Sequence, residues 1–228
     1  VDSNEEVMKK SLLILNKLSL TKFDKLSDDF IASGIGRNEE CLSSAMVLIV
    51  NKAQDEPHFS AMYAQLCLKL SATPMGFEGT SSKKGRKFKK MLLTACQAEF
   101  EQDTETKIAK AIEGIDDEEE KVYKAGIIKK HYLGHMTFIG ELFKGQLIGI
   151  KIMLLCLPML LDVKAESGAV IDEEKVECFA KLLSTIGYNL EQESEKLKEK
   201  GKNDTANELA KCWKKVEIMA GKREEKGG

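Results

Sequence analysis

Proline is scarce in this 228-residue sequence, which contains three, and apolar and polar residues nowhere alternate over a sustained stretch. Because such alternation marks half-buried strands, its absence argues against a β-sheet fold. An excess of one charge is also lacking, since 35 Lys and Arg face 37 Asp and Glu, for a net charge of −2. A general affinity for nucleic acid or membranes is therefore not expected, and a charged partner would have to bind a local patch.

Apolar runs long enough to cross a bilayer are missing as well. The most hydrophobic stretch, LIGIKIMLLCLPMLL at 147–161, has 15 residues and contains Lys151 and Pro158. A membrane-spanning helix needs roughly 20 apolar residues. We therefore expect a buried core helix, bent at Pro158. The sequence also starts without a basic and then apolar leader, and we expect residues 1–228 to be one domain excised from a longer protein.

Cys-x-x-Cys pairs and the Gly-x-Ser-x-Gly motif of hydrolase nucleophiles are absent. The six cysteines are widely spaced within apolar stretches, as is typical of buried, reduced thiols in a cytoplasmic protein. A zinc or redox site built on cysteine is therefore not expected. The cysteines are Cys41, Cys67, Cys96, Cys156, Cys178 and Cys212.

Apolar residues recur at helical spacing from one end of the sequence to the other. Short turns separate the helices, and pairs of about 40 residues are typical of stacked HEAT-type repeats. Periodicity predicts an all-α fold, either such an α-solenoid or an ordinary helical bundle. The clearest apolar stripes are Met8, Leu12, Leu15 and Leu18; Phe23, Leu26 and Phe30; Leu42, Ala45, Met46 and Ile49; Phe59, Met62, Tyr63, Leu66, Cys67 and Leu70; Phe88, Met91, Leu92, Ala95 and Cys96; Val176, Phe179, Ala180 and Leu183; and Leu209, Trp213 and Val216.

The turns between these helices carry their own signals. Pro57 occupies the first turn of a helix and favours a sharp corner between two helices, with Asp55 or Glu56 available as the cap. Thr21 is placed to cap the second helix, and Gly34 supplies a left-handed stop after it. The acidic block at 115–121 predicts the exposed start of a helix that leads toward Tyr132. The TFIGELF stretch (137–143) continues that helix or opens the next.

Two histidines offer the one pattern with metal-ligand spacing. His131 and His135 lie four residues apart in HYLGH, so a helix would place both on one face. A metalloprotease needs a glutamate after the first histidine, where this sequence has Tyr132, and no third ligand is evident. Ordinary, partly exposed histidines are therefore expected, with a metal-dependent hydrolase kept as a rival. His58 and Cys67 are nine residues apart and do not suggest a nucleophile and base, so neither an enzyme nor a cofactor is expected.

The run KKGRKFKK at 83–90 is the strongest local charge cluster. A solvated helix start explains many such runs. In a protein of nearly neutral charge, however, clustered cations around an aromatic residue also suit salt-dependent phosphate binding. The candidate RNA-binding residues are Lys83, Lys84, Arg86, Lys87, Lys89 and Lys90.

Five blocks of the sequence resemble, in order, the middle domain of eukaryotic translation initiation factor 4 gamma. They are LNKLSLTKFDKL (15–26), NKAQDEPHFSAMYAQLCLKL (51–70), KFKKMLLTACQAEFE (87–101), LGHMTFIGELFK (133–144) and ECFAKLLSTIGYNLE (177–191). The KAxxEPxFxxMYAxLC and FIGELFK patterns favour this factor over the surveillance, splicing and cap-binding proteins that share its fold.

The resemblance implies a crescent of about five HEAT-type antiparallel helix pairs, a cytoplasmic translation initiation scaffold without catalysis of its own. Such domains bind a DEAD-box RNA helicase of the initiation factor 4A type and contact mRNA. Some also bind the multisubunit factor that bridges to the small ribosomal subunit. Because they are polar and fall at helix corners, Asn16, Lys22, Asp55, Glu56 and His58 are the candidate helicase-binding residues.

Three departures from the family pattern accompany the resemblance. Pro158 interrupts a helix, residues 195–228 match poorly, and one further family helix is not evident at the end of the sequence. A stand-alone RNA-binding HEAT domain, or a related domain of mRNA surveillance or splicing, is the alternative function.

Overall fold

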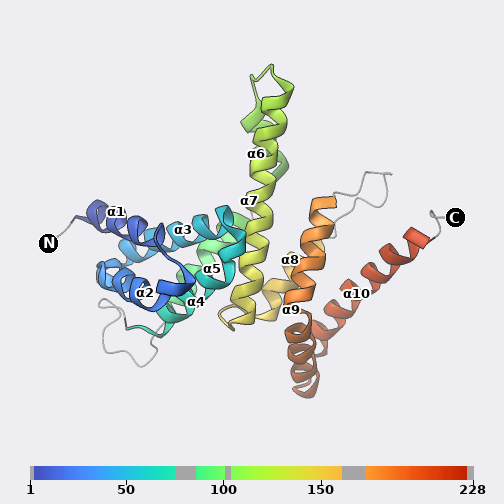
Figure 1. Cartoon of the computed structure of the whole chain (residues 1–228). Helices are drawn as coiled ribbons and strands as arrows, with labels where there is room; N and C mark the ends of the chain where they lie inside the picture. Colours follow the sequence, from blue (N-terminus) through green and yellow to red (C-terminus); the bar gives the residue numbers. More distant parts are fainter. Residues whose placement is uncertain (1–2, 75–85, 101–103, 161–172, 225–228) are drawn as a thin grey trace. The chain divides into compact units, whose positions relative to one another are not determined.

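The computed structural model describes residues 3–74, 86–100, 104–160 and 173–224. These ranges contain ten α-helices and three short 3₁₀ turns, with no strand among them, so the all-α prediction is confirmed (Figure 1). The chain divides into two compact units, residues 1–147 and 148–228.

The first unit is a stack of helices joined by short turns. In the sequence order, α1 contacts α2 and α3, α2 contacts α4, and α3 contacts α4, α5 and α7, so neighbouring helix pairs cover one another. The unit consists of α1 (Asn4–Leu15), α2 (Phe23–Ala32), α3 (Glu39–Asp55), α4 (Ser60–Ala72), α5 (Arg86–Phe100), α6 (Thr104–Ile112) and α7 (Glu118–Lys144), with 3₁₀ turns at Leu20–Lys22, Ile35–Arg37 and Pro57–Phe59.

Side-chain caps fix several helix starts. The Ser3 hydroxyl accepts from the Glu6 N–H at 3.2 Å while the Glu6 carboxylate accepts from the Ser3 N–H at 2.7 Å, a reciprocal capping box. Gly34 has a φ of 100°, the left-handed stop that the sequence predicts. The predicted cap at Thr21 is wrong, because a 3₁₀ turn comes first and makes Lys22 the N-cap of α2, without a side-chain bond.

The core of the first unit follows the two apolar stripes predicted at 42–49 and 59–70. Every residue of these two stripes is buried except Phe59, which is half-buried. The stripe predicted for the first helix is confirmed at Leu15 and Leu18 but not at Leu12, which is 38% exposed. Helix α1 also buries Val7 and Ser11, which the prediction left out. The Ser11 hydroxyl reaches the Ser33 hydroxyl at 3.0 Å, so a satisfied polar pair occupies a position that apolar periodicity overlooks.

The α6–α7 hairpin differs most from the prediction. The predicted acidic helix start is confirmed, since Asp117 caps α7 by accepting from the Glu119 N–H at 2.9 Å, and the 27-residue helix continues without a break through residues 137–143. Helix α6 was not predicted from the sequence. It contacts α7 along one side (Figure 1). The nine-residue sequence TETKIAKAI does contain a short apolar stripe, Ile108, Ala111 and Ile112, but none of its residues is fully buried.

The second unit contains α8 (Ile150–Leu160), α9 (Glu173–Glu199) and α10 (Asn203–Glu224), and each of these contacts the other two. Pro158 lies within α8, near its last residue, and Met153, Cys156 and Leu157 are buried. The predicted core helix at this stretch is confirmed. In α9 the buried stripe is Cys178, Phe179, Leu182, Ile186 and Leu190, which replaces the predicted Ala180 and Leu183.

All six cysteines are buried, and none of them forms a disulfide, as predicted. Among the described helices, none has both the length and the hydropathy to cross a membrane.

Candidate interaction surface at the helix corners

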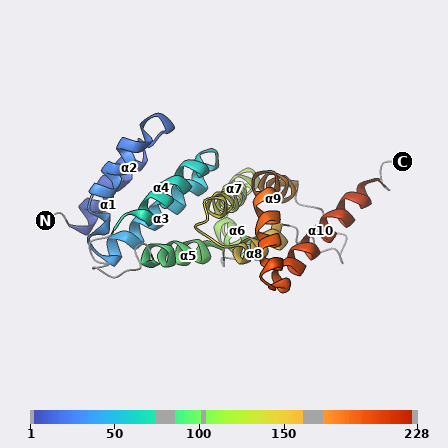
Figure 2. The same ribbon diagram turned by 90° about the horizontal axis from the view of Figure 1, so that it is seen from below.

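Two helix corners lie along one edge of the first unit. The side chains of Asn4 in α1 and Glu40 in α3 form a 2.7 Å hydrogen bond, so the starts of these two helices lie side by side. Their opposite ends therefore share the other edge, where α1 turns into α2 and α3 turns into α4 (Figure 2). We call residues 16–22 and 55–59 on this edge the corner surface.

Glu56 holds the second corner together. Its carboxylate accepts hydrogen bonds from Lys52 Nζ at 2.5 Å and from the buried Tyr63 hydroxyl. Burial acts to raise the pKa of Glu56, but these two donors outweigh it and hold the pKa below its usual value. Burial and the bond to Glu56 raise the pKa of Tyr63 in turn. Lys52 in α3 and Tyr63 in α4 are thus joined through one carboxylate.

Asp55 links the same corner to α7. Its Oδ1 lies 2.6 Å from His131 Nε2, and both side chains are about half exposed. The predicted capping role of Asp55 and Glu56 is wrong, because the turn at Pro57–Phe59 has no side-chain cap. Both carboxylates are instead used in contacts between helices.

The remaining three candidate residues point outward from the corner surface. Asn16 is the exposed C-cap of α1, and Lys22 is exposed at the start of α2. His58 is exposed, with its ring 4.2 Å from that of Phe59. These side chains are available to a partner, whereas Asp55 and Glu56 are committed within the fold.

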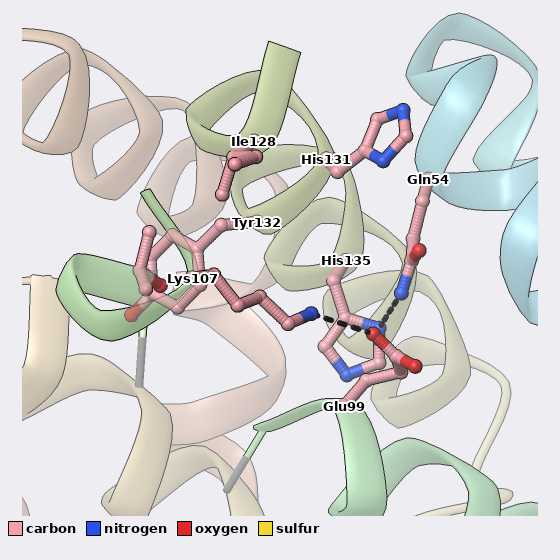
Figure 3. Close-up of a pocket in the computed structure, with 8 residues that line it drawn as sticks. Gln54, Glu99, Lys107, Ile128, His131, Tyr132 and His135 are labelled. Atoms are coloured by element: carbon pink, nitrogen blue, oxygen red, sulfur yellow. Dashed lines mark hydrogen bonds and ion pairs between the residues drawn. The ribbon is translucent and has the colours of Figure 1, made fainter. Parts of the chain in front are cut away.

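A small polar cavity lies behind the corner surface (Figure 3). Its volume is about 90 Å³, and α3, α5, α6 and α7 all contribute to its wall. Lys107 of α6 reaches Glu99 of α5 at 3.6 Å across the cavity. The lining residues are Gln54, Glu99, Thr104, Lys107, Ile128, His131, Tyr132 and His135.

His135 is buried in this wall rather than partly exposed, which corrects the prediction. Its Nε2 lies 3.0 Å from the Cys96 carbonyl, an acceptor, so Nε2 carries the proton. Nδ1 then accepts from the Gln54 amide at 3.4 Å. Both ring nitrogens of the neutral imidazole are used, and His131 is paired with Asp55. In the described part of the chain, no three metal-ligating side chains come together, so the HYLGH spacing does not form a metal site there.

The burial of His135 predicts a pH-dependent stability. Burial is the largest effect on its pKa and lowers it, while the Cys96 carbonyl and Glu99 oppose this and Lys107 adds to it. The unfolded chain, with a pKa of 6.5, therefore binds the proton first. Stability is fully present above about pH 6.5 and is lost progressively as the pH falls toward the folded pKa.

Urea unfolding at pH 7.5 and 5.5 measures this effect, and His135→Gln should reduce the difference in unfolding free energy between the two pH values. His131→Gln is the matched control on the same helix, and it should retain the His135 contribution. An unchanged pH difference in His135→Gln would contradict the buried neutral imidazole.

The backbones of α3 and α7 approach closely at Gly134. A Cβ atom at this position would lie 2.3 Å from the carbonyl oxygen of Gln54. This contact was not predicted from the sequence, although a glycine inside a long helix is itself a signal of close approach, since glycine costs about 1 kcal/mol there relative to alanine. Gly134, His131 and His135 thus fix α7 against the end of α3, next to the corner surface.

The structure describes part of the predicted RNA-binding run. Lys83 and Lys84 lie outside the described residues, and Arg86 begins α5. Phe88 is fully buried, while Lys89 and Lys90 are exposed, so α5 presents lysines on its outer face. Lys87 forms an ion pair with Glu39 of α3. At least one of the candidate cations therefore also connects two helices.

The chain is similar to one domain family and to several known proteins. The MIF4G domain family matches residues 8–214. Eukaryotic translation initiation factor 4 gamma 2 of Mus musculus is 33% identical over 206 residues, which cover 86% of this chain and 22% of that protein. Eukaryotic translation initiation factor 4 gamma of Schizosaccharomyces pombe is 34% identical over 203 residues, covering 82% of this chain and 14% of that protein. The chain thus spans about a fifth or less of the length of these relatives.

The crystal structure of the MIF4G domain of Trypanosoma cruzi translation initiation factor EIF4G5 covers 93% of this chain with a TM-score of 0.61 and 18% identity. That similarity shows a shared fold and confirms the predicted helical HEAT-type solenoid. The resemblance to translation initiation factor 4 gamma is confirmed by the relatives. The chain belongs to the MIF4G domain family.

Proposed function

We propose that this chain is a scaffold domain of translation initiation that binds a DEAD-box RNA helicase of the initiation factor 4A type and stimulates its ATPase activity. The observation that carries the proposal is the family match over residues 8–214, together with relatives named as translation initiation factors 4 gamma. In this proposal the chain acts in the cytoplasm by binding, and the helicase supplies the chemistry.

The corner surface supports the helicase contact. It presents side chains from two successive helix pairs on one edge, and contacts with α7 hold the second corner in place. A rigid element is a suitable docking site because little conformational entropy is lost on binding. Asn16, Lys22 and His58 would contact one lobe of the helicase directly, and Asp55 and Glu56 would position the corner.

The physical effect on the helicase is a restriction of its two lobes. A scaffold that binds both lobes favours a partly closed arrangement, and it therefore speeds the closing and opening steps that limit many ATPase cycles. The exposed lysines of α5, Lys89 and Lys90, would add a salt-dependent contact to mRNA. Binding of the multisubunit factor that bridges to the small ribosomal subunit is part of the same proposal.

The test is the RNA-stimulated ATPase rate of the helicase from the same organism, measured with and without the 228-residue chain. We expect a severalfold increase in the rate and a complex on gel filtration, because the scaffold limits the open state. No increase in rate together with no complex would refute the helicase proposal.

Charge reversal of α5 separates this function from the alternative, an RNA-binding domain without a helicase partner. Lys89→Glu with Lys90→Glu should weaken RNA binding, most at low salt, and leave the helicase complex intact. If the chain acts only through RNA, these changes remove all activity and Asp55→Lys at the corner has no effect.

A further inference from the structure

A groove runs between α1 and α2 on the surface of the first helix pair. Its volume is about 390 Å³, within the range that holds the side chains of a bound ligand. The α1 residues that bury against the fold are Val7, Ser11 and Leu15, and the groove residues occupy an adjacent face of the same helix. The groove is lined by Lys10, Leu13, Ile14, Lys17, Asp29 and Ala32.

The groove exposes apolar side chains. Leu13 is 60% exposed, far more than a leucine of the core, and it lies beside Ile14 and opposite Ala32. Apolar side chains exposed next to one another in a groove are unfavourable in water unless a partner covers them.

Two of the three charged residues in the groove lining are lysines, and both lysines are unpaired in the part of the chain that the structure describes. Lys10 and Lys17 lie two turns apart on either side of Leu13, and neither forms an ion pair within the described ranges. The neighbouring Lys9, by contrast, pairs with Glu5 at 2.7 Å. The single acidic residue in the lining is Asp29. Two cations on either side of an apolar centre complement a ligand with carboxylates on either side of an apolar side chain.

We propose that this groove binds an acidic amphipathic helix of a partner protein. Two antiparallel helices form a groove into which the side-chain ridge of a third helix fits, with apolar residues recurring at i, i+3 or i+4, and i+7. Such a helix places an apolar residue over Leu13 and Ile14, and its flanking carboxylates meet Lys10 and Lys17.

The lining favours a protein over RNA. The centre of the groove offers aliphatic side chains rather than the aromatic rings on which bases stack. Of the groove residues, only Lys17 also belongs to the corner surface. The proposal therefore goes beyond the helicase contact, and Leu13, which lies outside the corner surface, tests the groove separately.

The experiment titrates the ¹⁵N-labelled 228-residue chain with a synthetic 20-residue helical peptide that has leucines at i, i+4 and i+7 flanked by glutamates. We expect the amide resonances of Lys10, Leu13, Lys17 and Ala32 to shift, with weaker binding as salt rises. A peptide with lysine in place of each glutamate should not bind. An absence of shifts at these four residues up to millimolar peptide would overturn the proposal.

Matched variants test the apolar and the charged parts separately. Leu13→Gln should weaken peptide binding by at least about tenfold, because it removes the central apolar contact. Leu12→Gln is the control at the preceding position of the same helix, where Leu12 is also exposed but does not line the groove, and it should bind as the original chain does. Asp29→Lys should tighten binding of the acidic peptide, and Lys10→Glu should weaken it.

Two results would assign the groove to another partner and overturn the proposal. If a 20-nucleotide poly-uridine RNA shifts the same resonances and Leu13→Gln leaves that binding unchanged, the lysines form a nucleic-acid patch. If sedimentation velocity detects a dimer that Leu13→Gln abolishes, the groove is a contact between two copies of the chain. Equal effects of Leu12→Gln and Leu13→Gln would also refute the assignment.

Discussion

Gly134→Ala should lower the free energy of unfolding of the first unit by about 3 kcal/mol, because the added methyl group has no space. Its carbon would lie 2.3 Å from the Gln54 carbonyl oxygen and 3.0 Å from the carbonyl carbon and Cα of the same residue. All three are backbone atoms of α3, so no rotation of a side chain can relieve the overlap. The whole of α3 or α7 would have to move, and both are buried on the sides that face the core.

Gly126→Ala is the matched control, since it makes the same change in the same helix. Nothing lies within 4 Å of a Cβ at Gly126, so the substitution should stabilise the chain by up to about 1 kcal/mol through helix propensity. Urea unfolding followed by circular dichroism compares the two variants, and hydrogen exchange of α3 and α7 locates the effect. Equal stabilities for Gly134→Ala and the original chain would contradict the close contact of these helices.

The local part of this fold was predictable from sequence. The apolar stripes of α3 and α4 coincide with buried residues, Gly34 marks the turn before α3, and Pro57 marks the turn between the two helices. Each of these signals lies within a few residues of the structure it specifies. Two helices joined by a short turn must lie next to each other. The stacked repeat architecture therefore follows from the periodicity together with the family resemblance.

The contacts that fix the candidate site were not predictable in this way. Gln54 and His135 are 81 residues apart, and the pairing of Asp55 with His131 joins α3 to α7 across α4, α5 and α6. No local pattern encodes which helix crosses which. The exposed polar residues at the corner looked equivalent in sequence, and only the fold distinguishes Glu56, which two donors hold, from Lys22, which is exposed.

The distinction has a functional consequence, because α7 determines where the second corner lies. Asp55 is paired with His131, and Gln54 with His135, so the end of α3 is fixed by two side-chain contacts and the close approach at Gly134. A change in α7 therefore reaches the corner surface without touching a partner. Mutational effects on helicase binding can be direct or can pass through this contact, and the two are separable by experiment.

Lys22→Glu and His58→Glu should each weaken the helicase complex by about tenfold without changing the melting temperature, because both side chains are exposed and outside the core. Glu56→Gln should instead lower the stability by about 1–2 kcal/mol, since it loses a charge-assisted hydrogen bond with Lys52 and weakens the one with Tyr63. Its effect on the helicase should be small and should follow the loss of stability.

Tyr63→Phe decides whether Glu56 acts directly. Tyr63 is 1% exposed and cannot contact a partner, yet its hydroxyl donates to Glu56. If Glu56 only holds the corner, Tyr63→Phe and Glu56→Gln weaken the helicase complex to the same small extent in a binding titration. If Glu56 contacts the helicase, Glu56→Gln weakens the complex and Tyr63→Phe does not. His131→Gln and Asp55→Asn make the same comparison for Asp55. His131→Gln removes the ion pair from the α7 side and leaves Asp55 in place.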